Sequence, residues 1–69
     1  MTPDDFKAWR KAMGWNQTEA AEALGLSLGT IGNYERGSRR EDGRPAPVPR
    51  TVALACAAVA AGLRPWRQR

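Results

Sequence analysis

Apolar and polar positions alternate with helical spacing in the middle of the chain, between Gln17 and Gly37. A small or apolar side chain recurs every three or four residues in this stretch, at Ala20, Ala21, Leu24, Leu26, Ile31 and Tyr34. This periodicity predicts two short amphipathic helices whose inner faces meet. Gly25 can adopt the left-handed conformation that ends a helix, and the Ser27 hydroxyl can cap the next one. The stretch therefore predicts a helix-turn-helix, with helices at about 17–24 and from 27 or 28 to 36. An ordinary helical hairpin is the alternative.

Capping signals mark the ends of two helices in the first part of the chain. Thr2 can cap a helix of about 3–13 that starts with a proline and two aspartates, where the helix dipole favours negative charge. Gly14 is expected to end this helix. Asn16 with Glu19 three residues later is typical of a capping box, which predicts the start of the next helix.

The segment after residue 48 is apolar on nearly all sides and predicts a last helix of about Pro49–Ala61, stopped by Gly62. Its expected core residues are Val52, Leu54, Ala55, Cys56, Ala58 and Val59. Because a helix without a polar face must be covered on more than one side, we expect one face to pack on the other helices. The other face, with Leu63 and Trp66, is a candidate homodimer surface. A core helix in a monomer is the alternative.

The chain is long enough for one small domain, since 69 residues bury only about 60% of the surface of the unfolded chain. We expect residues 1–63 to form this domain, including a basic, proline-rich loop at 38–49. The loop is either a flexible linker or a basic element beside the preceding helix. Residues 64–69 are expected to form a basic tail that either frays or docks Trp66 against Trp9.

Residue usage limits the chemistry of the chain. There is no histidine, and Cys56 is the one cysteine, which excludes a disulfide, a Cys/His zinc cluster and a histidine-activated nucleophile. We expect no enzymatic activity, metal, cofactor or small-molecule ligand, and a small buried apolar side chain at Cys56. The longest apolar run, 52–61, is too short to span a bilayer, and no signal peptide is recognised. We therefore expect a cytoplasmic protein.

The net charge of +4 is unevenly distributed along the chain. Residues 1–35 carry three basic and five acidic side chains, whereas residues 36–69 carry eight arginines and two acids, so the halves have net charges of −2 and +6. A guanidinium group can donate two hydrogen bonds to one phosphate, so the second half is suited to a polyanion. A merely soluble basic surface is the alternative.

The outer face of the second motif helix carries candidate DNA contacts. With Ile31 and Tyr34 turned inward, the outward side chains are Ser27, Leu28, Thr30 and Asn33. Asparagine can pair with adenine through two hydrogen bonds, and the methyl groups of Leu and Thr can touch thymine methyls. Gly29 and Gly32 leave one stripe bare, which would allow close approach to either the first motif helix or a nucleic-acid groove. Gln17 is placed for a phosphate contact, although a solvated glutamine fits its spacing nearly as well.

Arg10 lies on the otherwise apolar face of the first helix, with Phe6, Trp9 and Met13. A buried charge needs a partner, and we expect Glu35 to provide it.

These residues together resemble the Cro/repressor, or Xre, family of phage and bacterial helix-turn-helix regulators. The resemblance rests on Asn16, Gln17, Glu19, Ala21, Gly25, Ile31 and the run Tyr34, Glu35, Arg36 and Gly37. It covers roughly Phe6 to Gly37 and the last helix, and implies an all-α fold of four or five helices that binds operator DNA, usually as a homodimer. Leu28 and Gly29 depart from the pattern, because relatives often carry long polar base readers there; shape readout would then be larger.

The resemblance also implies roles for single residues. Ser27, Leu28, Gly29, Thr30 and Asn33 would read bases in the major groove, and Arg10 and Glu35 would form an internal ion pair. The expected phosphate contacts are Asn16, Gln17, Arg36, Arg39, Arg40, Arg44 and Arg50. We accordingly expect a sequence-specific double-stranded DNA-binding protein that represses or autoregulates a phage, prophage or small-operon promoter. A protein-interaction or antitoxin-type dimerisation module with the same fold is the alternative.

Overall fold

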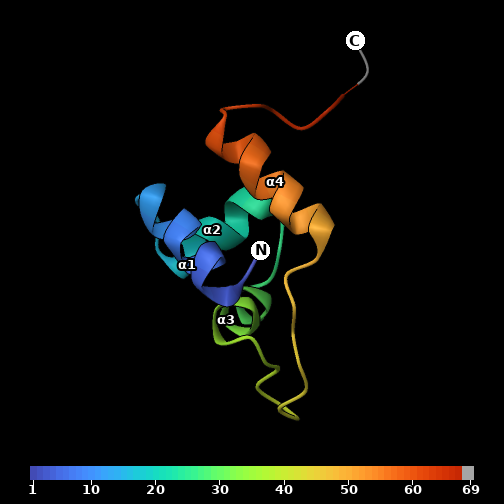
Figure 1. Ribbon diagram of the computed structural model, residues 1–69. Helices are drawn as coiled ribbons and strands as arrows, with labels where there is room; N and C mark the ends of the chain where they lie inside the picture. Colours follow the sequence, from blue (N-terminus) through green and yellow to red (C-terminus); the bar gives the residue numbers. More distant parts are fainter. Residues whose placement is uncertain (68–69) are drawn as a thin grey trace.

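The computed structural model describes residues 1–67 and contains four helices there, which confirms the expected all-α class (Figure 1). The helices are α1 (Pro3–Ala12), α2 (Gln17–Leu24), α3 (Leu28–Arg36) and α4 (Arg50–Ala60). Residues 68 and 69 of the expected basic tail lie outside the described part of the chain.

Local capping chemistry sets the ends of α1 and α2. The Thr2 side chain accepts a hydrogen bond from the Asp5 backbone N–H, and the Asp5 carboxylate accepts one in return. Asn16 and Glu19 make the same reciprocal pair at the start of α2, as the sequence predicts. The first helix ends at Ala12, one residue before the expected end, because Met13 occupies the capping position.

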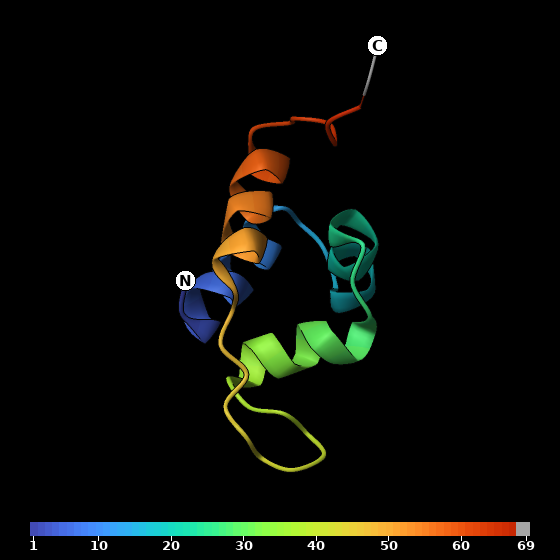
Figure 2. The same cartoon turned by 90° about the vertical axis from the view of Figure 1, so that its right-hand side faces the viewer.

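The turn between α2 and α3 has the expected helix-turn-helix geometry. Gly25 adopts a positive φ of 69°, and the Leu26 N–H donates to the Ala21 carbonyl at 2.9 Å, which closes the end of α2. Ser27 then caps α3 by accepting from the Thr30 N–H. The two helices cross at a steep angle (Figure 2), with Ala21 buried where they meet.

The hydrophobic core joins all four helices. The buried hydrophobic side chains are Phe6, Ala20, Ala21, Ile31 and Cys56. The Phe6 ring lies 5.5 Å from the rings of both Trp9 and Tyr34, measured between centroids. The Trp9 indole N–H also donates to the Cys56 carbonyl at 3.0 Å, which ties α1 to α4. Cys56 is therefore a buried residue of the core, as expected.

Helix α4 differs from the prediction at its start and in its buried face. Pro49 is the residue before the helix and provides no side-chain cap, so α4 begins at Arg50. Leu54, expected in the core, is 56% exposed. The reason is helical spacing: Val52 and Cys56 are four residues apart and share the inner face, so Leu54 between them points to the other side.

After α4 the chain first runs past the end of α2, where Leu63, Arg64 and Pro65 line a groove together with Ala23 and Leu24, and it then leads away from the four helices (Figures 1 and 2). Gly62 adopts a positive φ of 73° directly after the helix, and Trp66 is 90% exposed. The alternative of Trp66 docking on Trp9 is therefore wrong, because Trp9 already packs against Phe6 and Trp15.

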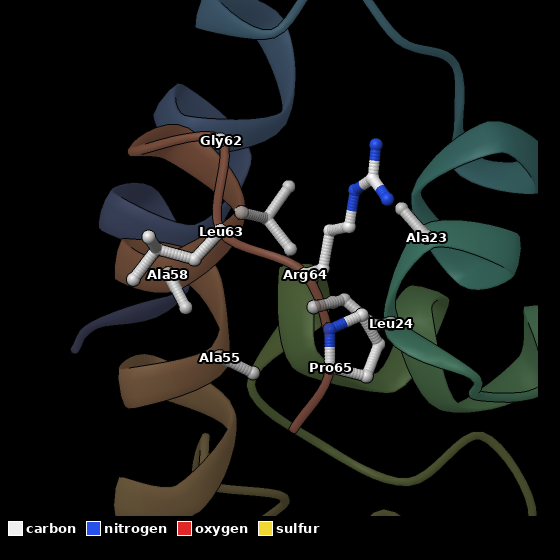
Figure 3. A pocket seen from close by; sticks show the side chains of 9 residues that line it. Ala23, Leu24, Ala55, Ala58, Gly62, Leu63, Arg64 and Pro65 are labelled. Carbon is white, nitrogen blue, oxygen red and sulfur yellow. The ribbon is translucent and has the colours of Figure 1, made fainter. Parts of the chain in front are cut away.

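An apolar groove separates the end of α2 from α4 and has a volume of about 440 Å³ (Figure 3). Ala23 and Leu24 form one wall, and Ala55, Ala58 and Val59 of α4 form the other. No helix in residues 1–67 is long and apolar enough to cross a membrane.

Candidate nucleic-acid interface

Helix α3 and the first turn of α2 border a shallow hollow of about 310 Å³ on the surface. Its lining residues are Gln17, Leu28, Gly29, Gly32, Asn33, Arg36, Arg40 and Glu41. Six of these are residues that the sequence singled out for base or phosphate contacts, and Gly32 belongs to the predicted bare stripe. The structure therefore brings half of the twelve predicted DNA contacts together around one hollow.

The two glycines of α3 face this hollow rather than α2. A side chain at Gly29 would meet no atom within 4 Å, and one at Gly32 would meet only the Arg36 Nη1 atom, at 3.5 Å. The glycines are thus not needed for packing within the protein. The sequence left open whether the bare stripe packs on α2 or faces an external partner, and in the structure it faces outward.

The first turn of α3 presents one prominent apolar side chain between two small polar ones. Leu28 is 52% exposed. The Ser27 Oγ atom accepts from the Thr30 backbone N–H at 3.2 Å and lies 2.7 Å from the Thr30 Oγ1 atom. Because these hydroxyls serve the helix cap, the side chain that this turn offers most fully to a partner is Leu28.

Asn33, expected to read a base, makes contacts that the sequence reasoning missed. Its Oδ1 atom accepts from the Arg36 Nη2 atom at 2.6 Å and from the Arg40 backbone N–H at 3.3 Å. The spacing of three residues between Asn33 and Arg36 is a signal that the sequence contains, since such residues are neighbours on a helix surface. The bond to Arg40 depends on the path of the loop and has no local signal.

The residues at the start of α2 meet the hollow unequally. Gln17 lines it. Asn16 uses its Oδ1 atom to cap the helix, at 2.8 Å from the Glu19 backbone nitrogen. Its amide nitrogen is the group that it would offer a phosphate.

The loop of residues 38–49, left open between linker and basic element, folds back on itself. An antiparallel bridge joins Ser38 and Pro45, and the Arg39 N–H donates to the Arg44 carbonyl at 2.7 Å. Gly43 forms the tip with a φ of 70°. The loop lies beside the end of α3 (Figure 2), so its arginines extend the surface of α3 with further basic side chains.

The loop acids lie near two of the loop arginines. The Arg39 Nε atom is 3.6 Å from a Glu41 oxygen and 3.8 Å from an Asp42 oxygen, and the Arg44 Nε atom is 3.7 Å from Asp42. Exposed pairs at these distances contribute at most about 1 kcal/mol each, so a phosphate can displace them. Arg50, at the start of α4, does not line the hollow.

The expected partnership of Arg10 and Glu35 is present in the structure. Two hydrogen bonds join the guanidinium and the carboxylate, from Nε to Oε2 at 2.6 Å and from Nη2 to Oε1 at 3.0 Å. Their side chains are only 13% and 8% exposed. Arg10 also donates to the Trp15 carbonyl at 2.9 Å. This one guanidinium therefore links α1, the segment before α2 and the end of α3.

The pair also sets the ionisation of Glu35. Burial raises the pKa of the carboxyl, but the hydrogen bond and positive charge of Arg10, with smaller contributions from Gln17 and Lys7, together outweigh burial, so the pKa lies below its ordinary value of 4.5. The hydrogen bond to Glu35 likewise raises the pKa of Arg10. Both groups are charged at neutral pH.

Comparison with known proteins yields one family. A family model described as helix-turn-helix matches residues 6–41, which is just over half of the chain and contains α2, α3 and most of α1. No curated protein and no solved structure matches the chain. The matched stretch contains every residue that lines the hollow.

Proposed function

Since the chain belongs to the Cro/C1-type, or Xre, family of helix-turn-helix proteins, which bind DNA and are not enzymes, we propose that it regulates transcription by binding a specific operator in double-stranded DNA. The observation that carries the proposal is the bare, outward-facing stripe of α3 beside Arg36 and Arg40. Its effect is repression or autoregulation of a promoter in a phage, a prophage or a small operon, because a bound operator blocks polymerase.

The recognition helix α3 enters the major groove by its first turn. Gly29 and Gly32 let the helix backbone approach the base edges closely, and Leu28 touches thymine methyl groups. Ser27 and Thr30 use one hydroxyl hydrogen in the bond between them and offer the other to a base edge at the same turn. With one apolar side chain and few long polar ones here, DNA shape supplies a large share of the specificity.

Phosphate contacts on either side of the groove fix the angle of α3. Gln17 and the backbone donors at the start of α2 hold one phosphate, assisted by the Asn16 amide. Arg36 and Arg40 border the hollow from the other side. Arg39 and Arg44 extend the contact along the loop, whereas Arg50 is a contact only if the DNA bends toward α4.

The active form is a homodimer that associates through α4 and the residues after it. Large apolar side chains are exposed there: Leu54 at 56%, Leu63 at 65% and Trp66 at 90%. The groove between α2 and α4 adds to this surface (Figure 3). A second copy would cover side chains that are otherwise costly to expose to water.

Selection of duplexes from a random pool, followed by binding titrations at several salt concentrations, tests the function. We expect a defined site and a log–log salt slope of about −4 per protomer, because four loop and helix arginines each displace about 0.9 of a counterion. Equal affinity for all duplexes, or tighter binding to an acidic protein that DNA does not compete away, would favour a protein-interaction module instead.

A further inference from the structure

Asn33 joins the recognition helix to the basic loop through a single oxygen atom. Its Oδ1 atom accepts from the Arg36 guanidinium at 2.6 Å and from the Arg40 backbone N–H at 3.3 Å. Both partners are donors, so the oxygen, and not the amide nitrogen, must face them. Arg36 is the last residue of α3, and Arg40 lies four residues farther along the loop.

These two bonds use the full accepting capacity of the oxygen. A carbonyl oxygen has two lone pairs, and both are directed to donors of the protein itself. Pairing with adenine requires that the same oxygen accept from the adenine N6 amino group while the amide nitrogen donates to N7. An adenine contact would therefore displace Arg36 or Arg40 and separate the loop from the helix.

The bonds also place charge where a phosphate would lie. Arg36 and Arg40 both line the hollow beside Gln17, the expected phosphate contact on α2. A long arginine side chain loses considerable rotamer freedom when it binds, so holding Arg36 before DNA arrives lowers the entropy cost of association. The bond to the Arg40 backbone holds the start of the loop at the same place.

We propose that Asn33 is a positioning residue that fixes Arg36 and the basic loop on α3 for phosphate binding, and that it is not a base reader. The proposal rests on the DNA-binding function proposed above. It differs from the role that the family resemblance implies for this position. Whether Asn33 holds the loop and whether it reads a base can be measured separately.

Amide hydrogen exchange in the DNA-free protein tests whether Asn33 holds the backbone at the start of the loop. In Asn33→Ala, the protection of the Arg40 amide should fall about fivefold, the effect of losing one ordinary hydrogen bond. Asn33→Asp retains an accepting oxygen and should keep the Arg40 amide protected. Leu28→Ala is the matched control, since it removes an exposed side chain from the same helix without touching the loop. Unchanged protection of Arg40 in Asn33→Ala would overturn the proposal.

Binding to the selected operator and to random DNA tests whether Asn33 reads a base. Asn33→Ala should weaken both alike and reduce the salt slope by up to about 2. In Asn33→Asp the added charge weakens binding generally, but the ratio of operator to random affinity should stay within about twofold. A base reader would lose that ratio by about 5- to 150-fold in both variants, because aspartate cannot donate to adenine N7. If the wild type showed no preferred duplex, the proposed function would be refuted. The exchange measurement would still show whether Asn33 holds the loop on α3.

Discussion

Arg10 and Glu35 illustrate how one residue pair can determine the orientation of α3, the proposed recognition helix. Their side chains are 13% and 8% exposed, and the bidentate geometry leaves little room for alternative partners. Removing one member strands the other charge in a poorly solvated site, which costs about 3 to 5 kcal/mol. For a 69-residue chain this is a large share of the whole stability.

The corresponding prediction concerns Glu35→Ala, Arg10→Met and the double variant, compared by thermal melting. Each single change should lower the melting temperature strongly, and Glu35→Ala should be largely unfolded near room temperature. The double variant should be less destabilised than the sum of the singles, because neither charge is left unpaired. Additive losses below about 1 kcal/mol would mean that the pair contributes nothing, as for an exposed ion pair.

The same carboxylate predicts how stability depends on pH. The pKa of Glu35 is below 4.5 in the folded chain and ordinary in the unfolded chain, so the unfolded state takes up a proton first on acidification. The contribution of the pair is thus complete above about pH 4.5 and is lost as the pH falls through the lower, folded pKa. Melting temperatures measured from pH 7 to pH 3 should be flat and then drop. Glu35→Gln is the control and should flatten the acid limb; an unchanged limb would assign it to other carboxyls such as Asp5.

Among the elements, the loop of residues 38–49 most directly combines structure with charge. Its backbone is closed by the bond from the Arg39 N–H to the Arg44 carbonyl, which leaves the arginine side chains at its surface. Because its ion pairs with Glu41 and Asp42 are exposed and long, they compete only weakly with phosphate. This is why the loop is proposed to bind phosphates.

Replacing Arg39 and Arg40 together by alanine measures that role. Affinity should fall equally for operator and random DNA, and the salt slope should become shallower by about 2 units, one for each lost contact. The double change Arg64→Ala and Arg67→Ala removes the same charge from the tail and should leave the slope nearly unchanged. If the two double variants had equal effects, the loop arginines would act only through the net charge of the protein and not through phosphate contacts.

How far the elements could be predicted from sequence depended on how local their causes are. Thr2, Asn16, Gly25 and Ser27 act within three or four residues of their own position, so the bounds of α1 to α3 were predicted to within a residue. In α4 almost every side chain is apolar, so the pattern could not indicate which face is buried, and Leu54 was assigned wrongly.

In the candidate site, too, the features with local causes were predicted and those that depend on the wider fold were not. The residues on the outer face of α3 and Gln17 were found because helical spacing places them there. The bonds from Asn33 depend on the fold of a loop whose sequence is also compatible with a flexible linker. Likewise, nothing local indicated that the chain after Gly62 would carry Trp66 away from Trp9.

In the whole molecule, the proposed DNA-binding and dimer surfaces are separated. Helix α3 and the loop lie at the lower end of Figure 1, whereas the chain that follows α4 lies at the upper end. A dimer through α4 would therefore leave both recognition helices available. Two such helices on one side of B-DNA require half-site centres about 10 base pairs apart.

The dimer predicts a sedimentation mass of two chains at micromolar concentration. Leu54→Glu should shift the mass to that of one chain, because a carboxylate would be buried at the contact. Leu28→Glu is a matched control, since Leu28 is similarly exposed but lies on the other surface. A wild-type mass of one chain with and without DNA, or selected sites without two-fold symmetry, would contradict the dimer.

The account as a whole depends on which face of the protein meets DNA, and a backbone amide map of the complex measures this directly. On titration with the selected duplex, we expect the largest NMR shift changes in residues 16–17, 27–33 and 36–44, with small changes in α4 apart from its dimer contacts. With a random duplex the same face should respond more weakly. If the largest changes instead fell on the groove between α2 and α4, with residues 27–33 unaffected, α3 would not be the recognition helix.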